Sequence, residues 1–137
     1  MKKILVIESD TSVSKLLEAT IGDLGLEFFS SVRLKPLHEI ISIKPDIILL
    51  EYRQPFGFGG DLCREIKTEP VTMRINVILT STDQHIAKIA RDNLADGYLH
   101  KPFNNSELIA AISNCLSKPE PVKPMAHKRS FWDTLKV

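Results

Sequence analysis

The chain has 137 residues, of which 43% are hydrophobic and 26% are charged, and its net charge is +1. This length and balance are typical of one soluble globular domain, and a charge this small gives no general attraction to nucleic acid or to an acidic membrane. Cys63 and Cys115 match no metal-binding or disulfide pattern, so we expect a reducing, cytoplasmic setting. The apolar runs are too short to predict a membrane span.

Strands and helices are predicted to alternate along the chain. Runs of β-prone apolar residues predict five strands, at residues 4–7, 26–30, 47–50, 75–79 and 97–100. Apolar residues at helical spacing predict five helices, at residues 13–24, 34–41, 62–66, 86–94 and 108–116. This alternation is typical of right-handed βαβ units in a doubly wound parallel sheet. We therefore predict an α/β fold of the flavodoxin-like (βα)5 type, with strand order 2-1-3-4-5.

Residues at the ends of the predicted helices support this assignment. Ser9 or Asp10 is expected to cap the first helix, because short polar side chains accept hydrogen bonds from its free N–H groups. Gly25 is expected to end that helix, since glycine adopts the left-handed conformation at low cost. Asn104 or Asn105 is expected to cap the last helix.

The third predicted strand marks the expected site. Residues 47–50 are all apolar, which indicates a strand buried on both faces, and Glu51 follows them directly. A proline and three glycines come next and turn the chain away. In the predicted order the first and third strands are neighbours, so Glu8 and Glu51 would lie side by side. That position is where ligands bind in open α/β sheets.

The last twenty residues differ from the rest. Residues 118–137 hold three prolines close together, and they carry five Lys and Arg against two Asp and Glu, a net charge of +3. Residues 1–117 carry thirteen against fifteen, a net charge of −2. We predict one domain over 1–117 and a proline-rich basic linker and tail over 118–137. Phe131, Trp132 and Leu135 are candidate apolar anchors of a docking peptide within that tail. The alternatives are a disordered end, or a linker to an output domain outside this chain.

The chain resembles the receiver domain of bacterial two-component response regulators. The matching residues lie at the ends of four of the five predicted strands, at 4–10, 45–51, 78–81 and 96–103, together with Pro55 and Gly59. The resemblance implies that Thr80 and Lys101 contact a phosphoryl group, and that Tyr98 is an aromatic whose rotamer changes with phosphorylation. It also implies a cis peptide bond from Lys101 to Pro102. Thr80 as a strand cap, and Tyr98 as fixed packing, are the alternatives.

Two residues depart from the family pattern. Glu51 stands where receivers place the aspartate that accepts the phosphoryl group, and Ser9 stands where they place the second acid of a magnesium pair. Glu8, Glu51 and the Arg53 carbonyl are the remaining candidate ligands, so we expect no cofactor or only weakly bound Mg²⁺. Asp10, one position after Ser9, is a further acid whose direction the sequence leaves open.

These departures favour a non-enzymatic pseudo-receiver over a phosphorylated one. Glu51 is one methylene longer than aspartate and could pair with Lys101 directly. The pair would either belong to a site that no longer accepts a phosphoryl group or be a structural ion pair only. The alternative is a magnesium-dependent receiver with residual phosphotransfer from a histidine kinase. A small flavodoxin-like cofactor binder is a third class, which the acids after the first strand oppose because they would repel phosphate.

The partner is expected to be a protein. By resemblance, the face formed by the fourth helix, the fifth strand and the fifth helix would bind a signalling partner, either a histidine kinase or a downstream protein. Its candidate contact residues are Lys88, Arg91, Tyr98 and Asn105. We expect a monomer or a weak homodimer, and neither nucleic acid nor a membrane as partner.

Overall fold

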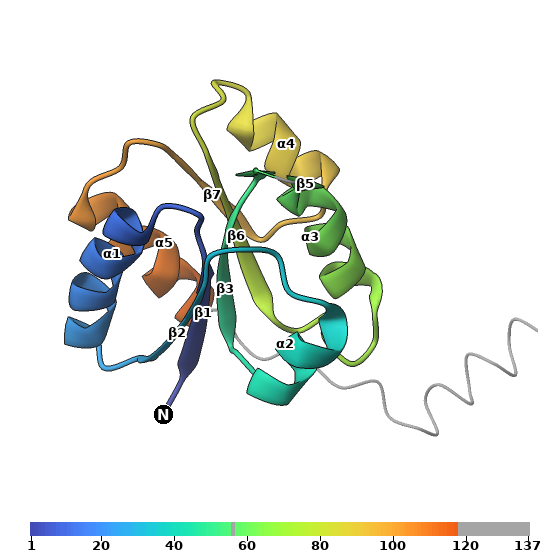
Figure 1. The fold of residues 1–137 in the computed structure, drawn as a ribbon, viewed down its shortest axis with the longest axis horizontal. Coiled ribbons are helices and arrows are strands. Elements are labelled where there is room, and N and C mark those ends of the chain that lie inside the picture. The colour runs from blue at the N-terminus through green and yellow to red at the C-terminus, as the bar shows by residue number, and fades with distance from the viewer. Residues whose placement is uncertain (56, 118–137) are drawn as a thin grey trace, which may run out of the picture.

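The computed structural model describes residues 1–55 and 57–117, so the predicted tail and docking peptide lie outside the described residues. The strands are β1 (Lys3–Ile7), β2 (Glu27–Ser31), β3 (Ile47–Glu51), β4 (Arg53–Gln54), β5 (Gly57–Phe58), β6 (Asn76–Ser81) and β7 (Gly97–His100). The helices are α1 (Thr11–Asp23), α2 (Leu37–Ile43), α3 (Gly59–Thr68), α4 (Ile86–Asp92) and α5 (Asn105–Leu116). Figure 1 shows the alternation of strands and helices along the chain.

Five of the strands form one parallel sheet in the order β2-β1-β3-β6-β7. Leaving out the short β4 and β5, this order is the predicted 2-1-3-4-5, so the flavodoxin-like fold is confirmed. The central strand β3 pairs with β1 on one side and β6 on the other, with Ile47 opposite both Ile4 and Asn76. Residues 47–50 are all buried, because the apolar run fills both faces of the sheet.

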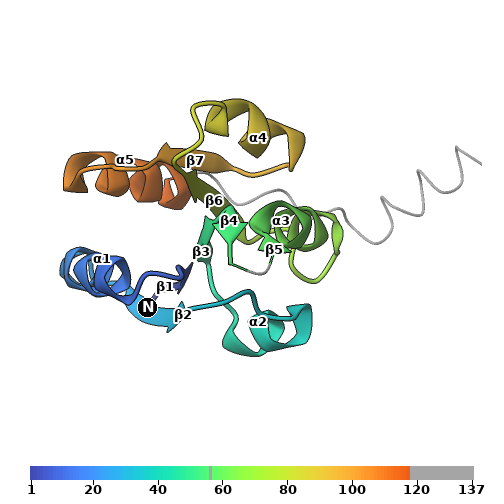
Figure 2. The same ribbon diagram turned by 45° about the horizontal axis from the view of Figure 1, so that its top comes forward.

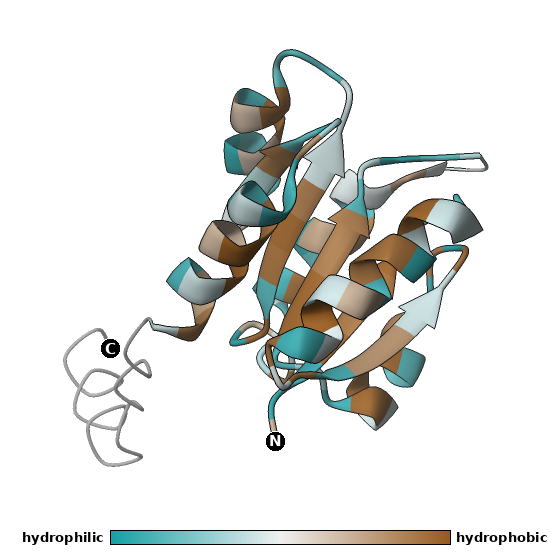
Figure 3. Ribbon diagram, turned by 90° about the vertical axis from the view of Figure 1, so that its left-hand side faces the viewer, coloured by the Kyte–Doolittle hydropathy of each residue, from teal (hydrophilic) through white to brown (hydrophobic). Residues whose placement is uncertain are grey.

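Helices cover both faces of the sheet (Figures 1 and 2). The core on one side packs α1 and α5 against the sheet through Leu17, Ile21 and Ile112. The core on the other side packs α2, α3 and α4 against it through Ile40, Ile66 and other apolar residues. The central strands are apolar along most of their length, as Figure 3 shows. None of the helices within residues 1–55 and 57–117 is long and apolar enough to cross a bilayer.

The predicted ends of the helices are largely confirmed. Asp10 caps α1 by accepting hydrogen bonds from the backbone of Ser12 and Val13. Gly25, just beyond the end of α1, has a φ of 77°, the left-handed conformation that glycine adopts at low cost. Asn104 caps α5 and forms a reciprocal capping box with Glu107.

Two details correct the sequence prediction. Helix α4 ends at Asp92, two residues before the predicted end, and Leu94 is 46% exposed with a φ of 67°. Its apolar side chain suggested a further turn of helix, but the backbone leaves the helix before it. The sequence also gave no sign of the small antiparallel hairpin in which β4 pairs with β5. Two-residue strands are too short to show a period of alternation.

Candidate functional site

The carboxyl ends of four parallel strands bring the predicted site residues together. Glu8 directly follows β1, Glu51 ends β3, and Lys101 directly follows β7. Thr80 lies near the end of β6, paired in register with Glu51 of the neighbouring strand. Because parallel strands end at one edge of the sheet, residues that are far apart in the sequence meet there.

Lys101 lies between the two glutamates. Its Nζ is 2.7 Å from Glu8 Oε1 and 2.8 Å from Glu51 Oε2. The side chains of Lys101, Glu8 and Glu51 are 18%, 4% and 12% exposed, so this ion cluster is largely shielded from water. Charge-assisted hydrogen bonds of this length are strong, and both hold the ammonium in one place.

The remaining carboxylate oxygens are also hydrogen-bonded. Glu8 Oε2 accepts from the backbone N–H of Asp10 at 3.0 Å. Glu51 Oε1 accepts from the backbone N–H of Ser9 at 3.0 Å, from Ser9 Oγ at 2.7 Å and from Gln54 Nε2 at 3.1 Å. All four oxygens of the two carboxylates therefore have donors within this chain, and Ser9 acts as a donor to Glu51 where receivers carry a further acid.

The cluster shifts the pKa values of its two acids in opposite directions. Burial raises the pKa of Glu8, and this effect outweighs the hydrogen bonds from Lys101 and Asp10. Burial also acts to raise the pKa of Glu51, but the hydrogen bonds from Lys101 and Ser9 outweigh it, so that pKa is lowered. The pKa of Lys101 is raised, because the two carboxylates outweigh the cost of burying its charge. Glu51 is thus the more firmly ionised acid.

The donor set does not fit Mg²⁺ in this arrangement. Magnesium requires near-octahedral oxygen ligation and binds through one or two carboxylates. Here the ammonium of Lys101 contacts both carboxylates, and Asp10 is turned away to cap α1. In the part of the chain that the structure describes, no group of three or more His, Cys, Asp or Glu could hold a metal ion.

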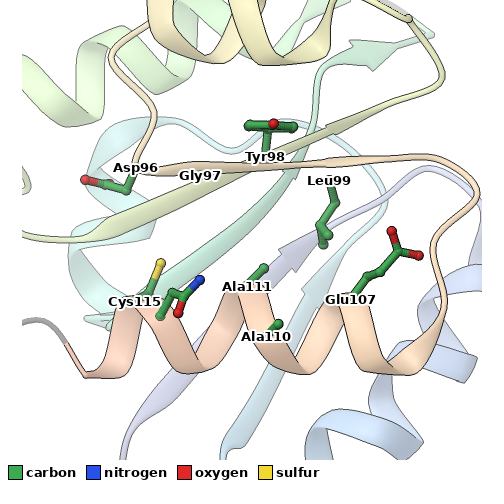
Figure 4. A pocket seen from close by; sticks show the side chains of 9 residues that line it. Asp96, Gly97, Tyr98, Leu99, Glu107, Ala110, Ala111 and Cys115 are labelled. Carbon is green, nitrogen blue, oxygen red and sulfur yellow. The ribbon is translucent and has the colours of Figure 1, made fainter.

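Thr80 and Tyr98 differ in their surroundings. Thr80 is buried, with 3% exposure, whereas Tyr98 is 49% exposed on strand β7 at the edge of the sheet. Figure 4 shows that Tyr98 and Leu99 point to opposite sides of β7, with Leu99 directed toward α5. The predicted role of Tyr98 as a switch residue stays a prediction, and its side chain is in an outward position here.

The predicted interaction residues do not all lie together. Lys88 pairs with Asp92 along α4, with Nζ and Oδ2 2.7 Å apart, and Arg91 lies on the same helix. Asn105 is placed differently, since its Oδ1 accepts a hydrogen bond from Thr20 Oγ1 of α1 at 3.2 Å. Asn105 therefore contacts α1.

Several site residues escaped the sequence analysis. Gln54 donates to both the carboxylate and the carbonyl of Glu51. Arg53 was considered only for its carbonyl, but its guanidinium pairs with Asp83 Oδ2 at 3.2 Å and lies 5.6 Å from the ring centre of Phe58. No periodicity signals such contacts, because they depend on how the β4–β5 hairpin folds back beside β3.

The fold and this arrangement of acids, hydroxyl and lysine at the strand ends define a response-regulator receiver domain. The family model for the response regulator receiver domain matches residues 4–113, and the chain belongs to that family. The resemblance drawn from the strand ends is confirmed.

Particular relatives support the same assignment. The phosphate regulon transcriptional regulatory protein PhoB of Pseudomonas aeruginosa is 29% identical over 88% of this chain and 54% of its own length. A putative response regulator from Chloroflexus aurantiacus aligns with a TM-score of 0.79 at 23% identity, covering 85% of this chain and 98% of that one. A two-component response regulator from Clostridium difficile aligns with a TM-score of 0.72 at 27% identity, covering 86% and 98%. The chain spans about half the length of the curated relatives it matches.

Proposed function

We propose that this receiver domain is a non-enzymatic signalling module whose state is not set by phosphorylation of the acid that ends β3. The observation that carries the proposal is the pair of contacts from Lys101 to Glu51 and Glu8, at 2.8 and 2.7 Å. By resemblance, that lysine would otherwise contact the incoming phosphoryl group. Here it neutralises the residue at the acceptor position.

Geometry supports the same conclusion. Phosphoryl transfer depends on positioning and on stabilisation of charge, and a misplacement of about 1 Å can cost on the order of 100-fold in rate. The extra methylene of Glu51 displaces its carboxylate by a distance of that order, and both of its oxygens already accept hydrogen bonds. With Ser9 in place of an acid, the site also lacks the carboxylate that would complete a magnesium pair.

The output of such a module would be contact with another protein. Receiver domains transmit signals by binding kinases or downstream proteins, so we infer a signalling protein as partner. The net charge of −2 over residues 1–117 gives no reason to expect direct binding of this domain to nucleic acid. The names of its relatives as transcriptional regulators describe chains about twice as long.

A phosphorylation assay tests the proposal. The protein is incubated with acetyl phosphate and Mg²⁺, and its intact mass is measured. We expect no adduct on the natural chain and an adduct on the double variant Ser9→Asp/Glu51→Asp, because that variant restores both missing acids. An adduct on the natural chain that is lost in Glu51→Gln would contradict the proposal and establish the alternative, residual phosphotransfer to Glu51.

A further inference from the structure

An apolar groove lies between α1 and the connection from β7 to α5. It has a volume of about 450 Å³. Its principal lining residues are Val13, Leu16, Leu17, Lys101, Pro102 and Phe103. The residues that line this groove are more apolar than those of three other surface pockets, which are lined in part by Tyr98, Arg33 and Phe58 respectively.

Leu16 makes this groove unusual. Its side chain is 73% exposed, although it lies beside Val13 and Leu17 on the same helix. A single exposed leucine needs no explanation, but one that forms the wall of an apolar groove marks a surface for binding. Asn105, which also lines the groove, accepts a hydrogen bond from Thr20 Oγ1, so α1 and the start of α5 are in direct contact there.

The chain itself contains a segment of matching chemistry. Phe131, Trp132, Leu135 and Val137 supply four apolar side chains within seven residues. They follow the basic run His127-Lys128-Arg129 in a tail of net charge +3, whereas the domain of residues 1–117 has a net charge of −2. Opposite net charges favour the return of such a tail to the surface of its own domain.

The tail is also long enough. Helix α5 begins at Asn105 beside the groove, and its 12 residues carry the chain about 18 Å away, toward the opposite edge of the sheet. Trp132 is the fifteenth residue after Ser117. In the extended conformation that prolines favour, they span up to about 45 Å, more than twice the distance back along α5.

We propose that the C-terminal segment, residues 130–137, docks into the α1–β7/α5 groove of its own chain. Trp132 and Phe131 would be the anchors, because aromatic side chains bury the most apolar area per ordered residue. The proposal does not depend on whether Glu51 is phosphorylated.

Tethering makes weak docking sufficient. A short linker gives an effective concentration on the order of 1 mM, so a segment with an intrinsic Kd of about 100 µM would be bound in about nine of ten molecules. A docked tail would cover Leu16 and the stem of Lys101. A partner protein that binds α1 would then have to displace the tail, which makes the tail an internal competitor.

The test uses the fluorescence of Trp132, the single tryptophan of the chain. Acrylamide quenching is measured on the full chain and on Leu16→Asp. A charge in the groove should weaken docking about tenfold, so the docked fraction falls to about one half and the accessible fraction of Trp132 rises about fivefold. Leu135→Asp in the tail should give the same increase while leaving the domain untouched.

Val71→Asp is the matched control. The exposed fraction of Val71, 68%, is similar to that of Leu16, but Val71 lies in the connection between α3 and β6 and does not line the groove. Trp132 should be quenched in this variant as in the natural chain. Equal quenching in all four proteins, or an equal increase in Val71→Asp, would overturn the proposal. Protection that appears only at concentrations where the mass is that of a dimer would overturn it too, because the tail would then dock on a second copy.

Discussion

Lys101 is the residue on which the arrangement of the site depends. Its ammonium is the charge that allows two buried glutamates, 4% and 12% exposed, to remain close together. Three chain segments that are distant in sequence meet through it, since Lys101 lies 93 residues from Glu8 and 50 from Glu51. The same contacts that stabilise this edge of the sheet oppose the use of Glu51 as a phosphoryl acceptor.

Replacing Lys101 by methionine should therefore destabilise the domain. Removal of one partner from a buried ion cluster leaves uncompensated charge and costs about 3 kcal/mol in unfolding free energy at pH 7. Urea unfolding measures this loss. The matched control is Lys88→Met, which breaks an ion pair whose side chains are 68% and 54% exposed and should leave the unfolding free energy almost unchanged, because water screens exposed pairs. Equal effects of the two variants would show that the cluster is not the stabilising feature.

The lowered pKa of Glu51 predicts how stability depends on pH. A carboxyl whose pKa is lower in the folded protein contributes stability above its unfolded pKa, near 4.5, and loses it as the pH falls through the folded pKa. Glu51→Gln should thus be less stable than the natural protein at pH 7, and the difference should shrink as the pH falls below 4.5. Urea unfolding between pH 3 and 7 measures this difference. A gap that stays constant with pH would contradict the assignment.

The pKa of Glu8 is shifted in the opposite direction to that of Glu51, so its effect on stability with pH is also opposite. Its pKa is raised by burial, so its ionisation costs stability as the pH rises from the unfolded pKa, near 4.5, through the folded one. The raised pKa of Lys101 affects only the alkaline side, where its contribution is lost as the pH passes above 10.5. The acid limb of the stability curve therefore reports on the two glutamates alone among these three groups.

At the scale of elements, the start of α3 is the part most tightly fitted to the site. A Cβ added at Gly59 would lie 2.6 Å from the carbonyl oxygen of Glu51 and 3.0 Å from Leu50 Cγ. Helix α3 can approach the end of β3 this closely only because residue 59 has no side chain. The β4–β5 hairpin lies between β3 and α3 in the sequence, and its Arg53 pairs with Asp83.

Gly59→Ala should consequently lower stability by about 2 kcal/mol, because backbone and a buried leucine must move to admit the methyl group. Gly22→Ala is the matched control, since nothing lies within 4 Å of its added Cβ in α1. Alanine is favoured over glycine inside a helix by about 0.5–1 kcal/mol, so this variant should be more stable than the natural protein. Thermal unfolding of both variants checks the opposite signs. Two shifts of the same sign would show that the close approach to Glu51 is not the cause.

In the whole molecule, largely buried ion pairs lie at both ends of the parallel strands. At the amino ends, opposite the site, Lys67 of α3 pairs with Asp96 just before β7, with Nζ and Oδ2 2.8 Å apart and side chains 13% and 19% exposed. Between the two ends of the strands, one apolar core packs on each face of the sheet. Leu17, which lines the groove beside α1, belongs to the core that also contains Val6 of β1 and Leu49 of β3, so a docked tail would contact a helix that packs directly on the strands carrying Glu8 and Glu51.

The sequence by itself determined the architecture and the position of the site. Apolar runs of four residues specify buried parallel strands, helical spacing specifies the layers, and Asp10 and Asn104 cap helices through contacts within three residues. These features depend on residues close together in the sequence, so they can be predicted from the sequence alone. The identities of Glu51 and Ser9 also stood in the sequence, as departures at the ends of predicted strands.

The tertiary structure alone decided what those residues do to one another. It placed Lys101 between Glu8 and Glu51, directed the Gln54 side chain toward the Glu51 carboxylate and placed Asn105 in contact with α1. Most of these contacts join segments tens of residues apart, and their geometry follows from strand register and loop path, neither of which leaves a periodic signal. An acid at a strand end can serve as an acceptor, a metal ligand or half of an ion pair, and only its neighbours in space distinguish these roles.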